Sequence, residues 1–299
     1  ANIDVEAQRS ISQGASQIRQ SERVVQRSIS GNIVIAGAKF VAFWFSGSTA
    51  VLAEFFHSLA DTGNQCLLLY GLRESVSVPD KRHQYGYGKS VYMWGLVSAV
   101  GCFWLGAGMS LMGAFLPGEM SAGVVTWSVL GISFVVDGYV LYINLRGLAT
   151  DKPAGRTWLE HLHRIRDPTT VAVVVEDVCA CIGIVAAAAG IALTELSGLS
   201  AFDTAASLFI SGMMAGCGGY LAFRNGRFLL GQSIEPERLA SIEQIVLRRG
   251  SIEDIHHVQS QWLSPEYFAF KAEVDFSGDF LNRQLFARYE PEYAQLAAR

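Results

Sequence analysis

The sequence predicts an all-α membrane protein: a bundle of six transmembrane helices, followed by a small C-terminal cytoplasmic α+β domain. Only 17% of the 299 residues are charged and 51% are hydrophobic, whereas a soluble domain carries about 25% charged residues. Apolar stretches close to the roughly 20 residues that span a bilayer recur six times before residue 230. The net charge of −4 gives no bias towards nucleic acid.

These stretches define the expected transmembrane domain, residues 28–230, between an N-terminal cytoplasmic segment, 1–27, and the C-terminal domain, 231–299. The expected helices cover residues 28–46, 50–72, 90–116, 122–145, 169–193 and 201–223. Turn-forming residues separate them, such as Gly47 and Ser48 after the first helix and Pro117 and Gly118 after the third.

Basic residues occur in alternate connections. Arginine and lysine lie before the first helix, between the second and third, between the fourth and fifth, and after the sixth. The other three connections, at residues 47–48, 117–121 and 195–199, contain none. Because positive residues stay on the cytoplasmic side, we expect an even number of spans with both termini in the cytoplasm. A soluble protein with buried helices would not sort its charges in this way. We expect the host membrane to be a bacterial inner (plasma) membrane.

The C-terminal domain has a different pattern. Residues 236–249 have the apolar periodicity of an amphipathic helix. Residues 255–262 and 267–276 favour two strands, the second with apolar residues at every other position from 268 to 276. A further helix is expected at 281–298. The order helix, strand, strand, helix predicts a small α+β domain that lacks a closing strand.

Five cysteines lie in the apolar stretches, and we expect reduced, buried thiols. Cys179 and Cys181 suggest a soft-metal site at first sight. Residues two apart on a helix point about 200° apart, so the spacing disfavours that interpretation.

Ionisable side chains within a bilayer are costly and are therefore candidates for function. His57 and Asp61 lie four residues apart on the second span, so they share one face of the helix. Asp177 lies about ten residues into the fifth span, at a similar depth. One imidazole and two carboxylates at mid-depth predict a site for zinc or a neighbouring transition metal, because magnesium and calcium prefer oxygen ligands. The alternative is a polar cluster that only holds helices together.

Two further residues extend this candidate site. Glu176 adjoins Asp177 but points about 100° away, and three roles stay open for it: a metal ligand, a proton site or a partner for another helix. Asn64 follows Asp61 by three residues and is placed to donate a hydrogen bond to a ligand.

Three polar residues lie around the site. Glu54 is one turn from His57, towards the expected outer mouth, and is a candidate for a proton pathway. Asp137 in the fourth span is a second such candidate. A purely structural interpretation pairs Asp137 with Lys39 in the first span, so that the two charges neutralise each other.

Several motifs together resemble the cation diffusion facilitator family. They are Ser46-Gly47-Ser48, residues 54–61 with the sequence EFFHSLAD, residues 79–89 with the sequence PDKRHQYGYGK, Asp203, and residues 270–275. The resemblance implies a homodimer of six-helix subunits with ferredoxin-like cytoplasmic domains. It also implies efflux of zinc, or of a similar divalent ion, in exchange for protons.

The resemblance also implies a ligand set. His57, Asp61 and Asp177 match the family's central site, whereas the fourth position is occupied by Val173, so that Glu176 or water would complete it. The Glu176–Asp177 pair is most similar to the zinc transporter 9-like branch.

Outside the membrane the resemblance gives weaker sites. Lys271 replaces the metal-binding histidine of many members, and His256 and His257 face opposite ways on a strand, so we expect no regulatory zinc site there. His161 and His163 are candidates for a second, cytoplasmic metal site or are simply solvated.

We therefore expect a zinc transporter that works by alternating access, with the metal as substrate and no prosthetic group. Export of manganese, iron or cobalt is an alternative within the family. A membrane metalloenzyme with Glu176 as base is another, although the sequence contains neither HExxH nor GxSxG. A metal sensor or scaffold is the third.

Overall fold

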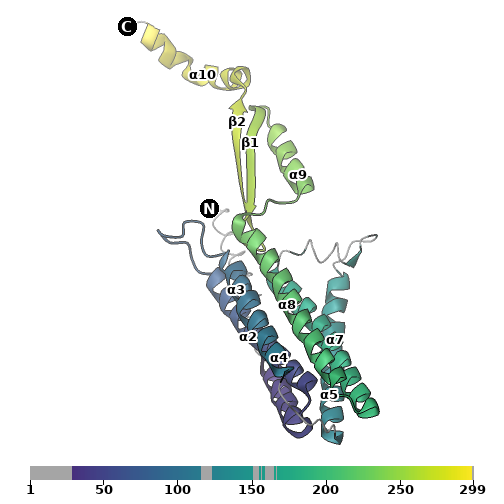
Figure 1. Cartoon of the computed structure of the whole chain (residues 1–299). Helices are drawn as coiled ribbons and strands as arrows, with labels where there is room; N and C mark the ends of the chain where they lie inside the picture. Colours follow the sequence, from purple (N-terminus) through teal and green to yellow (C-terminus); the bar gives the residue numbers. More distant parts are fainter. Residues whose placement is uncertain are drawn as a thin grey trace. The chain divides into compact units, whose positions relative to one another are not determined.

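The computed structural model describes residues 29–115, 123–150, 155, 157–158, 165 and 167–297. The chain divides into two compact units, the first ending at Leu229 and the second starting at Leu230 (Figure 1). The expected N-terminal segment, 1–27, lies outside the described residues, as does most of the connection between the fourth and fifth spans.

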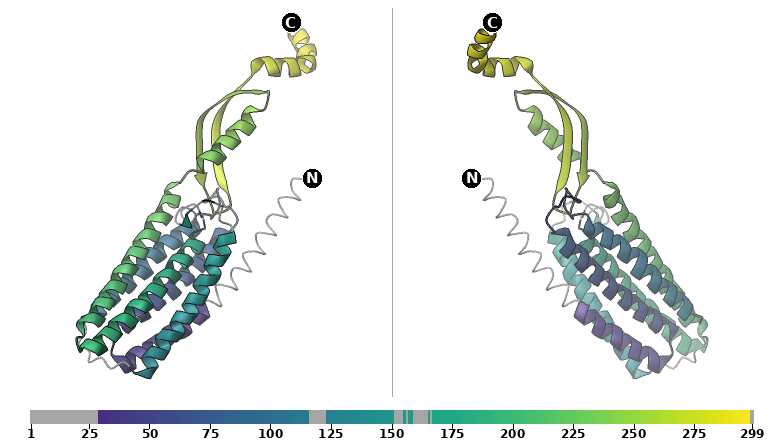
Figure 2. Two further views of the ribbon diagram at one scale, coloured as in Figure 1. Left: turned by 90° about the vertical axis from the view of Figure 1, so that its right-hand side faces the viewer. Right: turned by 90° about the vertical axis from the view of Figure 1, so that its left-hand side faces the viewer.

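The first unit contains six helical spans that run side by side (Figure 2). They are the first helix, Ile29–Ser46; α2, Thr49–Ser75; the third span, which is α3, Ser90–Ser98, η1, Ala99–Phe103, and α4, Trp104–Gly113; α5, Val124–Thr150; α7, Pro168–Ser197; and α8, Ala201–Leu230. Five of these spans are long and apolar enough to cross a membrane. The sixth, α2, is 27 residues long but carries several polar side chains.

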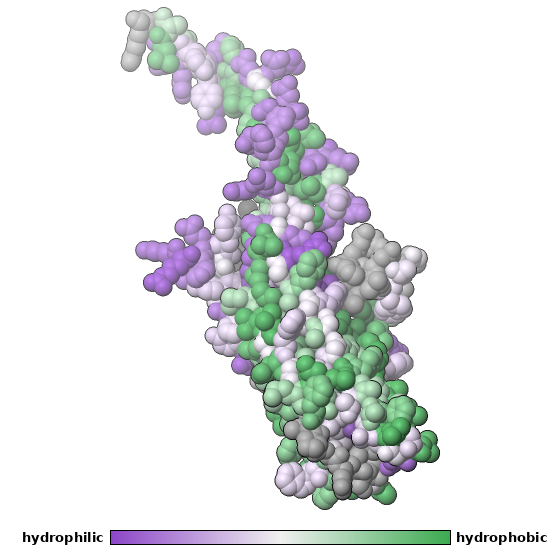
Figure 3. Space-filling view, viewed as in Figure 1, coloured by the Kyte–Doolittle hydropathy of each residue, from purple (hydrophilic) through white to green (hydrophobic). Residues whose placement is uncertain are grey.

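Helix α2 is the centre of the unit. It packs against α3, η1, α4 and α7, and the ring of Phe55 lies 5.2 Å from that of Phe40 on the first helix. Hydrophobic side chains cover most of the visible face of the first unit (Figure 3). The six-helix membrane bundle predicted from the sequence is thus confirmed, with its most polar helix packed against several of the others.

Local sequence explains where the helices begin and end. Gly47 adopts φ +64° and its N–H bonds to the carbonyl of Phe43 at 2.8 Å, which ends the first helix. Ser48 then caps α2 by accepting a hydrogen bond from the N–H of Val51 at 3.2 Å. Asp167 caps α7 in the same way, with Pro168 as its first residue.

The third span, expected at 90–116, is helical from Ser90 to Gly113 but changes its helix geometry on the way. Its middle, Ala99–Phe103, is π-helical. Helix α8 approaches closely here: a Cβ on Gly218 would lie 2.7 Å from Cβ of Phe103 and 2.9 Å from the carbonyl of Ala99. The sequence pattern gave no sign of this local change in helix geometry, because apolar residues occur on all sides of the span.

Helices α5 and α8 also continue beyond the expected ends at residues 145 and 223, to Thr150 and Leu230. A helix has no need to end where the hydrocarbon ends, since its internal hydrogen bonds persist in water.

The second unit has the predicted order of helix, strand, strand and helix. Helix α9 covers Pro236–Leu247, β1 Ile252–Trp262, β2 Phe268–Phe276 and α10 Gly278–Ala297. The two strands are antiparallel, with Trp262 opposite Phe268, and irregularities interrupt the register at residues 252–254 and 256–259. Trp262 is buried and packs edge-on against Phe268, with ring centroids 5.3 Å apart.

Candidate metal centre

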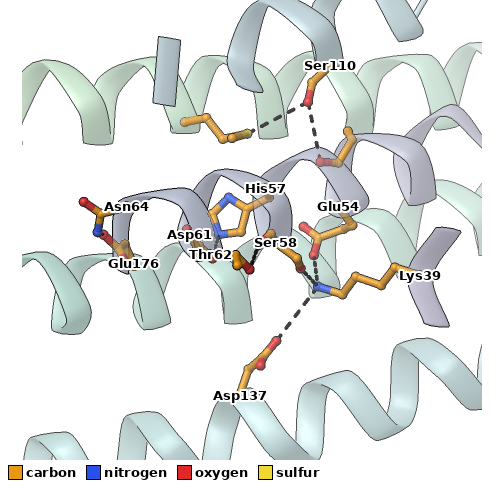
Figure 4. Close-up of polar contacts among 12 residues, drawn as sticks. Lys39, Glu54, His57, Ser58, Asp61, Thr62, Asn64, Ser110, Asp137 and Glu176 are labelled. Atoms are coloured by element: carbon orange, nitrogen blue, oxygen red, sulfur yellow. Dashed lines mark hydrogen bonds and ion pairs between the residues drawn. The ribbon is translucent and has the colours of Figure 1, made fainter. Parts of the chain in front are cut away.

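A line of polar side chains runs along α2 (Figure 4). Its members are Glu54, His57, Asp61 and Asn64, spaced by three or four residues, so that they share one face of the helix. All four are buried, His57 and Glu54 completely. The face of α2 that carries these four residues therefore points towards other helices of the bundle.

His57 and Asp61 form the centre of the line. Nε2 of His57 lies 3.3 Å from Oδ2 of Asp61, as the four-residue spacing predicts. Within the described residues, neither ring nitrogen of His57 has a hydrogen-bond partner of good geometry, and Oδ1 of Asp61 has none either. Unsatisfied buried polar atoms are rare and call for an explanation such as an ion.

Glu176 reaches the same line from α7. Its Oε1 accepts a hydrogen bond from the side-chain amide of Asn64, whose own oxygen accepts one from the hydroxyl of Ser98. The other oxygen, Oε2, is buried without a hydrogen-bond partner in the described part of the chain. Asn64 thus donates to a carboxylate on a second helix. Ser98 was not predicted, because nothing distinguishes one serine in an apolar span.

Asp177 lies apart from this line. It is half-buried, and its Oδ2 accepts a hydrogen bond of 2.6 Å from the amide of Asn144 on α5. Asn144 was not predicted, although an amide among apolar residues is a usable signal. In the ranges that the structure describes, no group of three His, Cys, Asp or Glu side chains is arranged to hold a metal ion. The predicted ligands are therefore not preassembled in this conformation.

Lys39 on the first helix contacts the polar side chains of α2. Its Nζ donates hydrogen bonds to Oε2 of Glu54 at 3.0 Å and to Oγ of Ser58 at 2.9 Å. It also lies 4.0 Å from Oδ2 of Asp137 on α5. The expected pairing of Lys39 with Asp137 is present, but Glu54 is the closer partner. Glu54 is fully buried.

The loop between α2 and α3 is ordered by one carboxylate. Asp80 accepts hydrogen bonds from the backbone N–H groups of His83, at 2.6 Å, and Arg82, at 2.8 Å, and from the hydroxyl of Tyr87, at 2.9 Å. The N–H of His83 is the largest cause that holds the pKa of Asp80 below its usual value, followed by the Tyr87 hydroxyl. The same bond raises the pKa of Tyr87.

The weaker candidates are four histidines outside the predicted spans and two cysteines. His161 and His163 lie outside the described residues. In the second unit, Nε2 of His256 lies 3.2 Å from Oδ2 of Asp275, and Nδ1 of His257 lies 2.8 Å from Oε2 of Glu273. The two imidazoles thus pair with different carboxylates. Cys179 and Cys181 are free thiols.

Taken together, α2 and α7 bury polar atoms that have no hydrogen-bond partner among the described residues: both ring nitrogens of His57, one of which is an acceptor in the neutral imidazole, and the acceptors Oδ1 of Asp61 and Oε2 of Glu176. Imidazole nitrogen and carboxylate oxygen are the ligand atoms that suit Zn²⁺ and its transition-metal neighbours. A cation or protons between these two helices would satisfy the acceptors.

Comparison with known proteins agrees with this chemistry. Residues 25–230 match the family model described as the cation efflux transmembrane domain. The chain is 34% identical over 266 residues to the mitochondrial proton-coupled zinc antiporter SLC30A9 of Mus musculus, an alignment covering 87% of this chain and 47% of the relative. The human counterpart is 33% identical over the same length, with the same coverage.

A plant relative is nearly as similar. Metal tolerance protein C4 of Arabidopsis thaliana is 31% identical over 271 residues, covering 88% of this chain and 59% of the relative. The chain thus spans about half the length of the curated relatives it matches.

Proposed function

The chain belongs to the cation efflux family, and from that premise we propose that it is a multi-pass membrane transporter that exports Zn²⁺ in exchange for protons. The observation that carries the proposal is the buried His57–Asp61 pair on α2, which packs against a helix that carries Glu176. One carboxylate oxygen of Glu176 has no hydrogen-bond partner in the part of the chain that the structure describes. Such a site has the ligand atoms for a dehydrated divalent cation.

Four side chains form the proposed site: His57, Asp61, Asp177 and Glu176. Glu176 takes the place of the fourth ligand, because the Val173 side chain has no atom that can bind a metal. In the structure Oδ2 of Asp177 accepts a hydrogen bond from Asn144, and the four side chains are not arranged to hold a metal ion, so that ligation requires side chains or helices to move. We propose that this rearrangement accompanies the change between inward-facing and outward-facing states.

Proton exchange follows from the same ligands. Zn²⁺ binds neutral imidazole and ionised carboxylate, so that metal binding displaces protons and protons displace metal. Glu54 and Asp137 border the site and belong to the proposed proton pathway. Selectivity for zinc over manganese, iron or cobalt is part of the proposal and is supported by the zinc named in the SLC30A9 relatives.

The topology, assembly and host membrane are further parts of the proposal. Alternation of basic loops supports cytoplasmic termini. Exposed aromatic residues on α10, such as Phe286 and Tyr293, 52% and 66% exposed, support a homodimer through the second unit. The relatives named above come from animals and a plant, so the bacterial inner membrane stays a prediction, to be tested by membrane fractionation of the source cells.

The decisive experiment is Zn²⁺ uptake into proteoliposomes that contain a zinc-sensitive dye and a pH dye. Wild type should accumulate zinc and move protons in the opposite direction. Asp61→Ala should abolish both signals, and Glu176→Gln and Asp177→Asn should each reduce zinc uptake by at least tenfold. Asp279→Ala removes an exposed carboxylate on α10 and is the matched control. Zinc uptake by Asp61→Ala at the wild-type rate would overturn the site assignment.

The same assay separates the transporter from the metalloenzyme. An enzyme would turn over substrate in detergent, whereas a transporter requires sealed vesicles. Zinc-dependent hydrolysis in detergent without any uptake in vesicles would contradict the proposal.

A further inference from the structure

Lys39 is an unusual residue for its position. It is the only lysine or arginine between Ser28 and Leu72, and it lies in the middle of the first helix rather than in a loop. Its side chain is fully buried. A cation within a bilayer is expensive unless it is compensated, and such residues mark functional sites.

Three helices meet at this ammonium group. Nζ bonds to Glu54 and Ser58 on α2 and lies within 4.0 Å of Asp137 on α5 (Figure 4). Ser58 directly follows His57, and Glu54 precedes it by one turn. The positive charge is therefore attached to the same part of α2 that carries the proposed metal ligands.

Glu54 extends the network to α7. Its Oε2 bonds to Lys39, while its Oε1 is buried without a partner among the described residues. A Cβ added to Gly183 of α7 would collide with Oε1 of Glu54, so that this oxygen lies directly against α7. The Lys39–Glu54 pair thus borders the α2–α7 interface where the metal would bind.

We propose that Lys39 is a resident counter-cation that sets the affinity of the metal site. Without metal, the ammonium compensates Glu54 and Asp137. With metal bound, its positive charge repels the divalent cation and keeps the affinity low enough for release, because a transported ion must bind well enough to enter and weakly enough to leave. The inference rests on the proposed function of the site. A purely structural role, in which the ion pair only ties helices together, is the competing interpretation.

The two roles differ in what they predict for zinc binding. We would measure the zinc Kd of detergent-solubilised protein by competition with a fluorescent chelator, and KM and kcat for uptake into proteoliposomes. Lys39→Met should lower Kd and KM at least tenfold, about 1.4 kcal/mol, and lower kcat because zinc leaves slowly. Lys39→Arg keeps the charge and should stay within threefold of wild type.

A second variant changes the charge in the opposite direction. Glu54→Gln keeps the shape of the side chain but leaves the ammonium less compensated, so that Kd should rise at least tenfold. A structural tie would instead give the two variants the same outcome, a lower melting temperature with unchanged Kd. If Lys39→Met does not fold, Glu54→Gln still decides: a Kd within twofold of wild type would overturn the proposal.

Failure of this inference differs from failure of the proposed function. If wild type neither binds nor transports zinc, the proposed function is wrong. If wild type transports zinc but both variants keep its Kd and KM within twofold, only the role of Lys39 is wrong. Asp203→Asn is the control for loss of a buried charge away from the site, and it should lower the melting temperature without changing Kd.

Discussion

The side-chain amide of Asn64 donates a hydrogen bond to Oε1 of Glu176, and this bond joins α2 to α7 one turn from Asp61. The oxygen of Asn64 in turn accepts a hydrogen bond from Ser98 at the end of α3. Asn64 is thus held from two sides, and it holds one oxygen of Glu176, whereas the other oxygen has no partner among the described residues. We regard Asn64 as a residue that positions the Glu176 carboxylate for metal.

Replacing Asn64 should therefore weaken zinc binding. Asn64→Leu keeps a similar volume but removes the donor to Glu176, and loss of a group that orients a ligand typically costs about 10–100-fold in metal affinity. The measurement is the zinc Kd in detergent. Ser98→Ala, which removes only the donor behind Asn64, should have a smaller effect in the same direction. An unchanged Kd for Asn64→Leu would show that Glu176 does not depend on this bond.

Asp203 should contribute to stability without contributing to zinc affinity. Its carboxylate at the start of α8 accepts hydrogen bonds from Oγ of Ser48 at 2.6 Å, from the N–H of Thr49 at 2.7 Å and from Oγ1 of Thr49 at 2.9 Å. Hydrogen bonds to charged groups contribute about 1.5–3 kcal/mol each, so Asp203→Ala should lower the melting temperature by roughly 5 °C or more.

Thermal unfolding in detergent, with and without zinc, tests this prediction. Asp279→Ala, on the exposed side of α10, is the control that should leave the melting temperature unchanged. The prediction is contradicted if Asp203→Ala has the same melting temperature as wild type, or if it loses zinc affinity while its melting temperature is unchanged.

Gly183 should be sensitive to the smallest side chain. A Cβ there would collide with Oε1 of Glu54, and Glu54 is fully buried with its other oxygen on Lys39. Gly183→Ala should therefore lower the melting temperature and disturb the Lys39–Glu54 pair. Gly212→Ala on α8, where the added Cβ meets nothing within 4 Å, should be neutral or stabilising by up to about 1 kcal/mol, since alanine favours a helix. Equal melting temperatures for the two variants would count against the close contact.

The loop between α2 and α3 should keep its order at acid pH. Hydrogen bonds, chiefly from the N–H of His83, hold the pKa of Asp80 below its ordinary value. A carboxyl group with a lowered pKa stabilises the folded loop above the unfolded pKa, about 3.9, and that contribution is lost as the pH falls through the folded pKa.

Hydrogen exchange at the N–H groups of Arg82 and His83 measures this order. Protection, corrected for the intrinsic exchange rate, should stay constant from about pH 7 to pH 4.5 and fall only below the ordinary carboxyl range. Asp80→Ala should lose the protection at pH 7. Loss of protection already near pH 5 in the wild type would show that these bonds do not lower the pKa.

Local features were readable from the sequence because they depend on neighbours along the chain. The length of the apolar stretches predicted the transmembrane helices, and the four-residue spacing of His57 and Asp61 placed both residues on one face of α2. Alternation of apolar and polar residues predicted the second strand of the C-terminal domain. The membrane bundle and the α+β order followed from these periodicities, and both are present in the structure.

Contacts between helices could not be predicted from the sequence, because they depend on how each helix is rotated about its axis and how closely it approaches its neighbours. The sequence alone identified the polar residues within the spans, including Lys39 and Asp177. Only the tertiary structure decided that Glu54 is the closest acidic partner of Lys39 and that Asp177 accepts a hydrogen bond from Asn144. The physical reason is that helical spacing is set by backbone hydrogen bonds within a segment, whereas the partner of a buried charge is set by side-chain packing between segments far apart in the chain.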